Sequence, residues 1–138
     1  MPDSVLLDTC AAVWLMGGEP MSHASRAAIR SARGDNLGVY VSPFTAWEIG
    51  ALVAKGRLKL TLSPEVWFES LLALPSIRLA ALTPQILLAS TALPGTPPSD
   101  PADRIIAATA RVSGHVIISR DKKLVDYALA GHIRIVIC

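Results

Sequence analysis

Residues 100–121 read DPADRIIAATARVSGHVIISRD, and this stretch decides the fold. Asp100 followed by Pro101 is a typical helix start, because the carboxylate accepts free backbone N–H groups and proline suits the first helical position. Gly114 ends this helix, and the apolar run 116–119 has the character of a short buried strand. Asp121 follows directly. The stretch therefore predicts a helix, then a strand, then an acidic residue just beyond the strand.

The same alternation continues outward in both directions. Strands are expected at 4–7, 37–41, 77–82, 116–119 and 133–137, and helices at 9–17, 22–34, 42–55, 63–74, 83–94, 100–114 and 122–130. The strands are nearly continuous apolar runs, as expected of strands covered on both faces. Alternating strands and helices form a parallel sheet. We therefore predict an α/β fold with a parallel five-stranded sheet, helices on both faces, and a single domain over residues 1–138.

Composition excludes several classes of protein. Of 138 residues, 51% are hydrophobic and only 5% aromatic, so the chain is too apolar to be disordered. Two cysteines argue against a disulfide scaffold. No apolar run approaches the roughly 18 residues of a membrane span, and no leader pattern is apparent, so we expect a cytoplasmic protein. The mean hydropathy of +0.45 favours a homo-oligomer or a protein partner. The net charge of +2 permits nucleic-acid binding without requiring it.

Acidic residues stand at the places where an α/β sheet binds ligands, outside the carboxyl ends of its strands. Asp8 closes the first expected strand, Asp121 follows the fourth, and Asp103 lies on the helix that leads into it. Glu48 is the only charge in the apolar helix 43–54, which predicts a helix buried all round. A carboxylate there is costly unless it is paired, hydrogen-bonded or bound to a metal. The pattern predicts that these acids converge.

Converging carboxylates repel one another, and a hard divalent cation such as Mg²⁺ or Mn²⁺ would relieve the repulsion. Such an ion could activate water for phosphodiester cleavage. Each acid also has a simpler reading, as a turn residue, a helix cap or a hydrogen-bonded core carboxylate. The neighbouring cations could hold an RNA backbone or could be ordinary solvated charges; these are Arg104, Arg120 and Lys122.

Assembled in this way, the chain resembles the PIN-domain ribonucleases, and among them the VapC-type toxins of toxin–antitoxin pairs. The matching segments are 5–9 (VLLDT), 41–49 (VSPFTAWEI), 100–110 (DPADRIIAATA) and 117–121 (IISRD). The resemblance implies an acidic, catalytic metal site made by Asp8, Glu48, Asp103 and Asp121. It implies supporting hydroxyl groups at Thr9 and Ser119, and a further acid behind the ligands at Asp100.

The resemblance also implies a function. The activity would be endonucleolytic cleavage of RNA with Mg²⁺ or Mn²⁺, by a protein that forms homodimers. The partner would be a small antitoxin that blocks the site and binds DNA, so this chain would meet DNA only through the antitoxin. The alternative is a non-catalytic protein that uses the same fold to bind RNA or a partner.

Overall fold

The computed structural model describes residues 3–138 and contains a five-stranded sheet. The strands are β1 (Val5–Leu7), β2 (Val39–Val41), β3 (Ile77–Leu79), β4 (Val116–Ser119) and β5 (Ile135–Ile137). They are ordered β3-β2-β1-β4-β5, and every neighbouring pair is parallel. The predicted α/β fold with a parallel five-stranded sheet is confirmed.

Strand β1 begins one residue later than predicted, and three further strands are shorter by two residues or more. Strand β2 begins at Val39 because the N–H groups of Leu37 and Gly38 both bond the Ala32 carbonyl at the end of the preceding helix. Strand β3 lies at the sheet edge and ends at Leu79, after which the chain turns toward the next helix. Strand β5 begins at Ile135, since Ile133 packs into the core before the ladder starts.

Each helix starts within one residue of its predicted position. They are α1 (Thr9–Gly17), α2 (His23–Gly34), α3 (Pro43–Ala54), α4 (Pro64–Leu72), α5 (Pro84–Thr91), α6 (Pro101–Ser113) and α7 (Lys122–Leu129). Each is preceded by a Ser, Thr or Asp whose side chain accepts a backbone N–H of the first turn. Helix α5 ends at Thr91, short of the predicted 94, and the proline-containing loop follows it directly.

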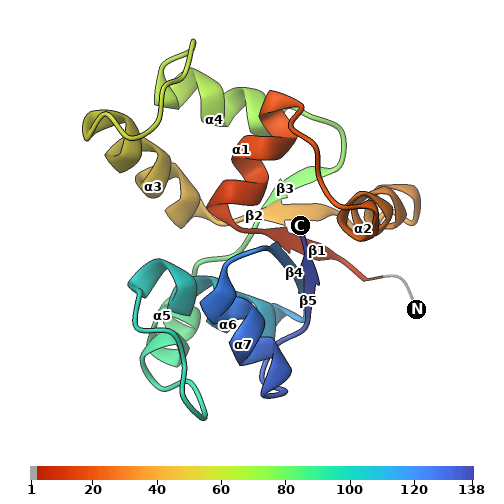
Figure 1. Cartoon of the computed structure of the whole chain (residues 1–138), viewed down its shortest axis with the longest axis vertical. Helices are drawn as coiled ribbons and strands as arrows, with labels where there is room; N and C mark the ends of the chain where they lie inside the picture. Colours follow the sequence, from red (N-terminus) through yellow and green to blue (C-terminus); the bar gives the residue numbers. More distant parts are fainter. Residues whose placement is uncertain (1–2) are drawn as a thin grey trace.

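The helices form two layers around the sheet (Figure 1). Helices α1 to α4 pack on one face, against side chains such as Val5, Leu7 and Ile118. Helices α6 and α7 pack on the other face against Leu6 and Ile117, and α5 packs on α6. Successive strand residues point to opposite faces, so both layers gain a buried apolar core. The apolar strands are therefore explained by double coverage.

The order of the strands fixes where a ligand can bind. The chain builds outward from β1 to β2 and β3, and then returns to place β4 on the other side of β1. A doubly wound sheet leaves a crevice beyond the carboxyl ends of its strands at this reversal. The crevice here lies between β1 and β4, which are followed by Asp8 and Asp121 respectively.

Helix α3 departs from the prediction that it would be buried all round. Only Thr45 and Ile49 of this helix are buried, and Trp47 is 64% exposed and stacked on Phe44. The apolar sequence therefore does not reflect burial within this chain. Separately, among residues 3–138 no helix combines the length and apolar character needed to cross a bilayer.

Candidate functional site

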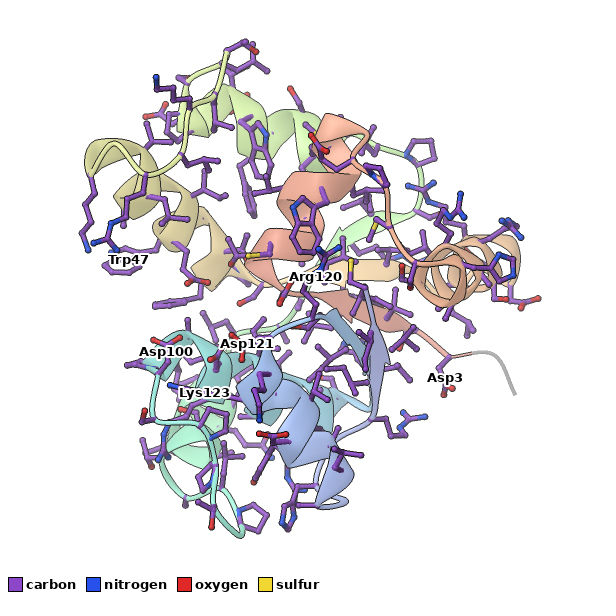
Figure 2. The ribbon with its side chains drawn as sticks, viewed as in Figure 1. Asp3, Trp47, Asp100, Arg120, Asp121 and Lys123 are labelled. Carbon is purple, nitrogen blue, oxygen red and sulfur yellow. The ribbon has the colours of Figure 1, made fainter. Side chains whose placement is uncertain are left out.

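A cavity of about 420 Å³ lies beyond the carboxyl ends of β1 and β4. Figure 2 shows Asp100, Arg120 and Asp121 at the junction between the two helical layers, where this cavity opens. Its lining includes every predicted metal-binding acid and several of their predicted neighbours: Asp8, Thr9, Cys10, Trp14, Glu48, Asp100, Ala102, Asp103, Ile106, Arg120 and Asp121. Four separate segments of the chain therefore converge on one place.

Asp8 is the most deeply buried acid of the cavity. It is 9% exposed and caps α1, with Oδ1 accepting the Ala11 N–H at 2.8 Å. Its Oδ2 accepts a hydrogen bond from the Ser119 hydroxyl, which is fully buried at the end of β4. The same Ser119 oxygen accepts the backbone N–H of Asp121 at 3.0 Å. Ser119 therefore fixes the two strand-end acids relative to each other.

Glu48 is held from a different helix. The Thr9 hydroxyl, in the first turn of α1, donates to Glu48 Oε1, and Thr45 Oγ1 lies 3.3 Å from the same hydroxyl. Glu48 is half-buried in the second turn of α3. This bond joins α1 to α3 and explains how a carboxylate is accommodated on an otherwise apolar helix.

The remaining acids stand at helix starts. Asp100 caps α6, and its Oδ2 accepts the Asp103 N–H at 3.4 Å. Asp121 caps α7, and its Oδ1 accepts the N–H groups of Lys123 and Leu124. Asp103 is half-buried in the first turn of α6, on the face that carries Ile106 into the core. The simple reading of Asp100 as a helix cap is thus true, and Asp121, for which the simpler reading was a turn, is a cap as well; both also line the cavity.

The pKa values report uncompensated negative charge. Burial, together with the neighbouring acids Asp121, Asp100, Glu48 and Asp8, raises the pKa of Asp103 to about 7. The pKa of Asp8 is also raised, mainly by burial, against the lowering effect of its hydrogen bonds from Ser119 and Ala11. Burial likewise raises the pKa of Glu48 despite the bond from Thr9. A cation in the cavity would be attracted to this excess of acid.

The donor set fits a hard divalent cation. Carboxylate oxygens are the ligands that Mg²⁺ and Mn²⁺ prefer, and the cavity offers them from four strands and helices. Within the described part of the chain, no three His, Cys, Asp or Glu side chains are drawn together as a ready ligand cage. Mg²⁺ keeps several waters and uses one or two carboxylates, so a loosely spaced acidic cavity suits it better than a closed cage.

The predicted cations lie in different places. Arg120 lines the cavity, with its guanidinium carbon 3.8 Å from the centre of the Trp14 ring. Arg104 donates to the Ser90 carbonyl at 3.3 Å, and Lys122 pairs with Asp126 at 2.9 Å on the exposed face of α7. Neither Arg104 nor Lys122 is in the cavity lining. Their assignment to substrate binding stays a prediction.

Sequence reasoning missed several lining residues, namely Cys10, Trp14, Ala102 and Ile106. A signal was available for Cys10 and Trp14, because they are four residues apart on the helix that Asp8 starts and so share one face. The pKa of the Cys10 thiol is raised by burial and by the surrounding acids, Asp8 first among them. Trp14 packs against the hydrophobic core, and its ring also forms the wall on which Arg120 stacks.

The fold and the acidic crevice together define a nuclease-like α/β domain of the PIN type. The model of the PIN domain family matches residues 5–129, and the chain belongs to this family. It is 33% identical over 123 residues to Ribonuclease VapC22 of Mycobacterium tuberculosis, covering 88% of this chain and 89% of that protein.

Solved structures share the fold at low sequence identity. A chain of VapBC2 from Rickettsia felis, in a complex bound to a promoter DNA fragment, matches with a TM-score of 0.69 and 12% identity, over 96% of this chain and 97% of that one. A chain of DNA-bound VapBC from Salmonella typhimurium matches with a TM-score of 0.62 and 19% identity, over 98% of both chains.

Proposed function

We propose that this protein is a Mg²⁺- or Mn²⁺-dependent endoribonuclease and the toxin of a toxin–antitoxin pair. The observation that carries the proposal is the set of acids in one cavity at the sheet reversal, Asp8, Glu48, Asp103 and Asp121. The similarity to Ribonuclease VapC22 over most of the chain supports the same activity. The residues match the requirement of phosphodiester hydrolysis for several oxygen ligands around one divalent ion.

The chain's own residues would hold the reacting groups in place. When bound, the divalent ion supplies a Lewis acid beside the scissile phosphate. Ser119 and the Ala11 N–H keep the Asp8 carboxylate in one orientation, and Thr9 does the same for Glu48. Such supporting bonds set the direction of ligand oxygens. Asp103 and Asp121 close the other side of the cavity from the starts of α6 and α7.

The substrate must reach an acidic cavity although its backbone is anionic. Arg120 lies in the lining and can donate to a phosphate, with its side chain braced on Trp14. Arg104 and Lys122 stand next to ligand residues in sequence and would contact the backbone farther out. The protein would act in the cytoplasm, because its RNA substrate and its antitoxin would both be made there.

The proposal includes a cognate antitoxin and a homodimer. The structural relatives in Rickettsia felis and Salmonella typhimurium are VapBC complexes bound to DNA. By analogy, this chain would bind an antitoxin that covers the cavity and carries the contact to DNA. The exposed apolar surface of α3, with Trp47 and Phe44, supports a protein partner or a second copy.

The test is cleavage of total cellular RNA by the purified, partner-free protein with Mn²⁺, Mg²⁺ or EDTA, alongside Asp8→Asn. We expect discrete fragments that require metal and disappear in the variant, whose circular dichroism matches the wild type. RNA binding without cleavage in either metal would support the non-catalytic alternative instead. Cleavage that persists in EDTA would contradict the proposed chemistry.

A further inference from the structure

A row of arginines on α2 takes no part in the site described so far. Arg26, Arg30 and Arg33 are spaced by four and three residues, so they lie on one face of the helix. We call them the α2 arginine row. Like charges at this spacing destabilise a helix. Arg33, in the last turn, is favoured by the helix dipole, but Arg26 and Arg30 are not accounted for in this way.

The row is not neutralised within the chain. In the part of the chain that the structure describes, the ion pairs join Lys122 to Asp126 and Arg134 to Asp3. Arg26 and Arg30 are exposed, whereas Arg33 is half-buried. The Arg33 Nε is covered by neighbouring atoms and has no hydrogen-bond partner among residues 3–138. Part of this guanidinium is therefore covered without an acid to compensate its charge.

The row surrounds a small hollow. A cavity of about 260 Å³ is lined by the three arginines together with Leu15, Met21 and Ile29. Charged groups therefore stand around an apolar floor. A nucleic acid presents the same combination, with phosphates along its backbone and flat bases that bury well on apolar side chains. Along the helix axis, Arg26 and Arg30 are about 6 Å apart, and Arg30 and Arg33 about 4.5 Å apart. An extended single strand could therefore place successive phosphates along the row.

The hollow adjoins the acidic cavity across a single helix. Trp14 lines the acidic cavity, and the next residue, Leu15, lines the hollow beside α2. Arg120 stacks on Trp14, so it lies against α1. In Figure 2, Arg120 lies beside α1, and α2 lies to the right of it. Arg120 and the α2 arginine row therefore flank the same helix, α1.

We infer that the α2 arginine row is a second binding site for the RNA backbone, outside the acidic cavity. The inference rests on the proposed function and names how the same substrate is held. An acidic cavity repels the strand that it must cleave, so affinity has to come from phosphate contacts elsewhere. Arginine suits this role because its planar guanidinium donates two hydrogen bonds to one phosphate. The row would position the strand without reading its sequence.

The test measures binding separately from cleavage. Binding of a fluorescent single-stranded oligoribonucleotide of mixed sequence is followed by anisotropy in the Asp8→Asn background, across a series of KCl concentrations. We expect Arg26→Ala with Arg30→Ala to weaken binding about tenfold at low salt. The slope of log affinity against log salt should fall by about 1.4, because each lost phosphate contact to a single strand contributes about 0.7.

Matched variants separate local contact from net charge. Lys55→Ala with Arg57→Ala removes the same charge from the exposed end of α3 and should change the slope by much less. Arg26→Lys with Arg30→Lys should keep most of the salt dependence. An effect of the α2 pair no larger than that of the α3 pair would overturn the inference. Unchanged RNA binding together with lost binding of poly-glutamate would assign the row to an acidic protein segment and also overturn it.

The cleavage assay distinguishes this inference from the proposed function. In an otherwise wild-type chain, Arg26→Ala with Arg30→Ala should raise KM for RNA and leave kcat nearly unchanged, because both residues lie outside the acidic cavity. If the α2 variant loses RNA binding and the wild type does not cleave RNA, the binding site at the row is supported and the proposed nuclease activity is rejected. Normal cleavage with an unaffected KM would reject the row alone.

Discussion

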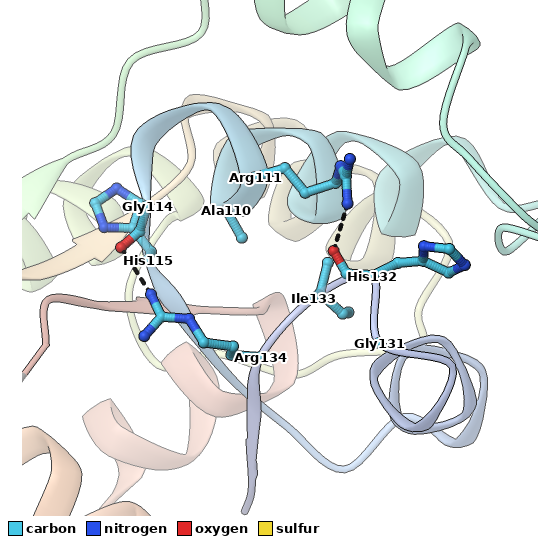
Figure 3. A pocket seen from close by; sticks show the side chains of 8 residues that line it. All are labelled: Ala110, Arg111, Gly114, His115, Gly131, His132, Ile133 and Arg134. Atoms are coloured by element: carbon cyan, nitrogen blue, oxygen red, sulfur yellow. Dashed lines mark hydrogen bonds between the residues drawn. The ribbon is translucent and has the colours of Figure 1, made fainter.

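Two cavities of similar size lie at opposite ends of the sheet and differ in how their charges are compensated. The acidic cavity measures about 420 Å³, and the other, lined by ends of α6 and α7, about 380 Å³. Figure 3 shows the second cavity, where Arg111 donates to the His132 carbonyl at 2.6 Å and Arg134 to the Gly114 carbonyl at 3.2 Å. Arg134 also pairs with Asp3 at 3.0 Å.

The buried histidine of the second cavity is also hydrogen-bonded. His115 is buried, with its Nδ1 2.7 Å from the Ser4 hydroxyl, and burial and the nearby Arg134 lower its pKa, which favours the neutral ring. The acidic cavity instead collects carboxylates whose pKa values are raised by burial and by one another. Cavity size therefore does not identify the site; uncompensated charge does.

The largest expected effect is that of Asp8→Asn. The amide keeps the shape of the side chain and its role as a cap of α1, but removes the charge that would bind the cation. RNA cleavage should fall by well over about 100-fold, since even the partners of metal ligands are worth about 10–100-fold. Arg111→Ala at the other end of the sheet should leave the rate unchanged. Equal losses in both variants would break the comparison.

Ser119→Ala should have an intermediate effect. It removes the hydroxyl that donates to Asp8 and accepts the Asp121 N–H, without touching a proposed ligand atom. Cleavage should fall by about 10–100-fold and the metal concentration needed for half-maximal rate should rise. Ser119→Cys, which keeps a weak donor, should be less affected. A rate loss without any shift in metal dependence would argue against this positioning role.

Asp103→Asn should stabilise the metal-free protein at alkaline pH. The folded pKa of Asp103, about 7, lies above its unfolded value, so the folded state binds more protons in between and stability falls as pH rises through that window. Removing the charge should gain on the order of 1–2 kcal/mol in EDTA at about pH 8, after allowance for screening of a half-exposed group. Near about pH 4 the gain should vanish. Urea unfolding at the two pH values measures both.

The smallest effect is expected from Arg134→Ala. The guanidinium bonds a carbonyl at the end of α6 and pairs with Asp3, but both contacts are exposed. Unfolding free energy should fall by about 0.5–1 kcal/mol, with cleavage unchanged. A thermal melt and an RNA cleavage assay on the same sample measure the two quantities. A large loss of activity would place function at this end of the sheet.

The sequence predicts the fold well because its signals are local. Cap residues such as Asp100 and Ser63 mark the helix starts, and apolar runs mark the strands. Helix and strand ends are less certain, since they depend on bonds such as Leu37 N–H to the Ala32 carbonyl, which joins a loop to the end of α2.

The site is predictable in its acids and less so in their surroundings. Charges on apolar elements are costly, and this cost alone marks Glu48 and Asp103. The directions of long side chains depend on tertiary partners. Arg120 and Arg104 were both predicted to bind the substrate, but Arg120 stacks on Trp14 and Arg104 donates to the Ser90 carbonyl. The exposure of Trp47 likewise cannot be predicted from the apolar sequence of its helix, because the same pattern is typical of a core helix and of an interface helix.

The most direct test of the central claim is calorimetric titration of Mn²⁺ into the partner-free protein and into Asp8→Asn, at about pH 8 where Asp103 is ionised. We predict saturable binding by the wild type, weaker binding near about pH 6 because protons compete for the carboxylates, and binding by the variant weaker by at least about tenfold. Equal binding by the two proteins, or none by a folded wild type, would contradict the account.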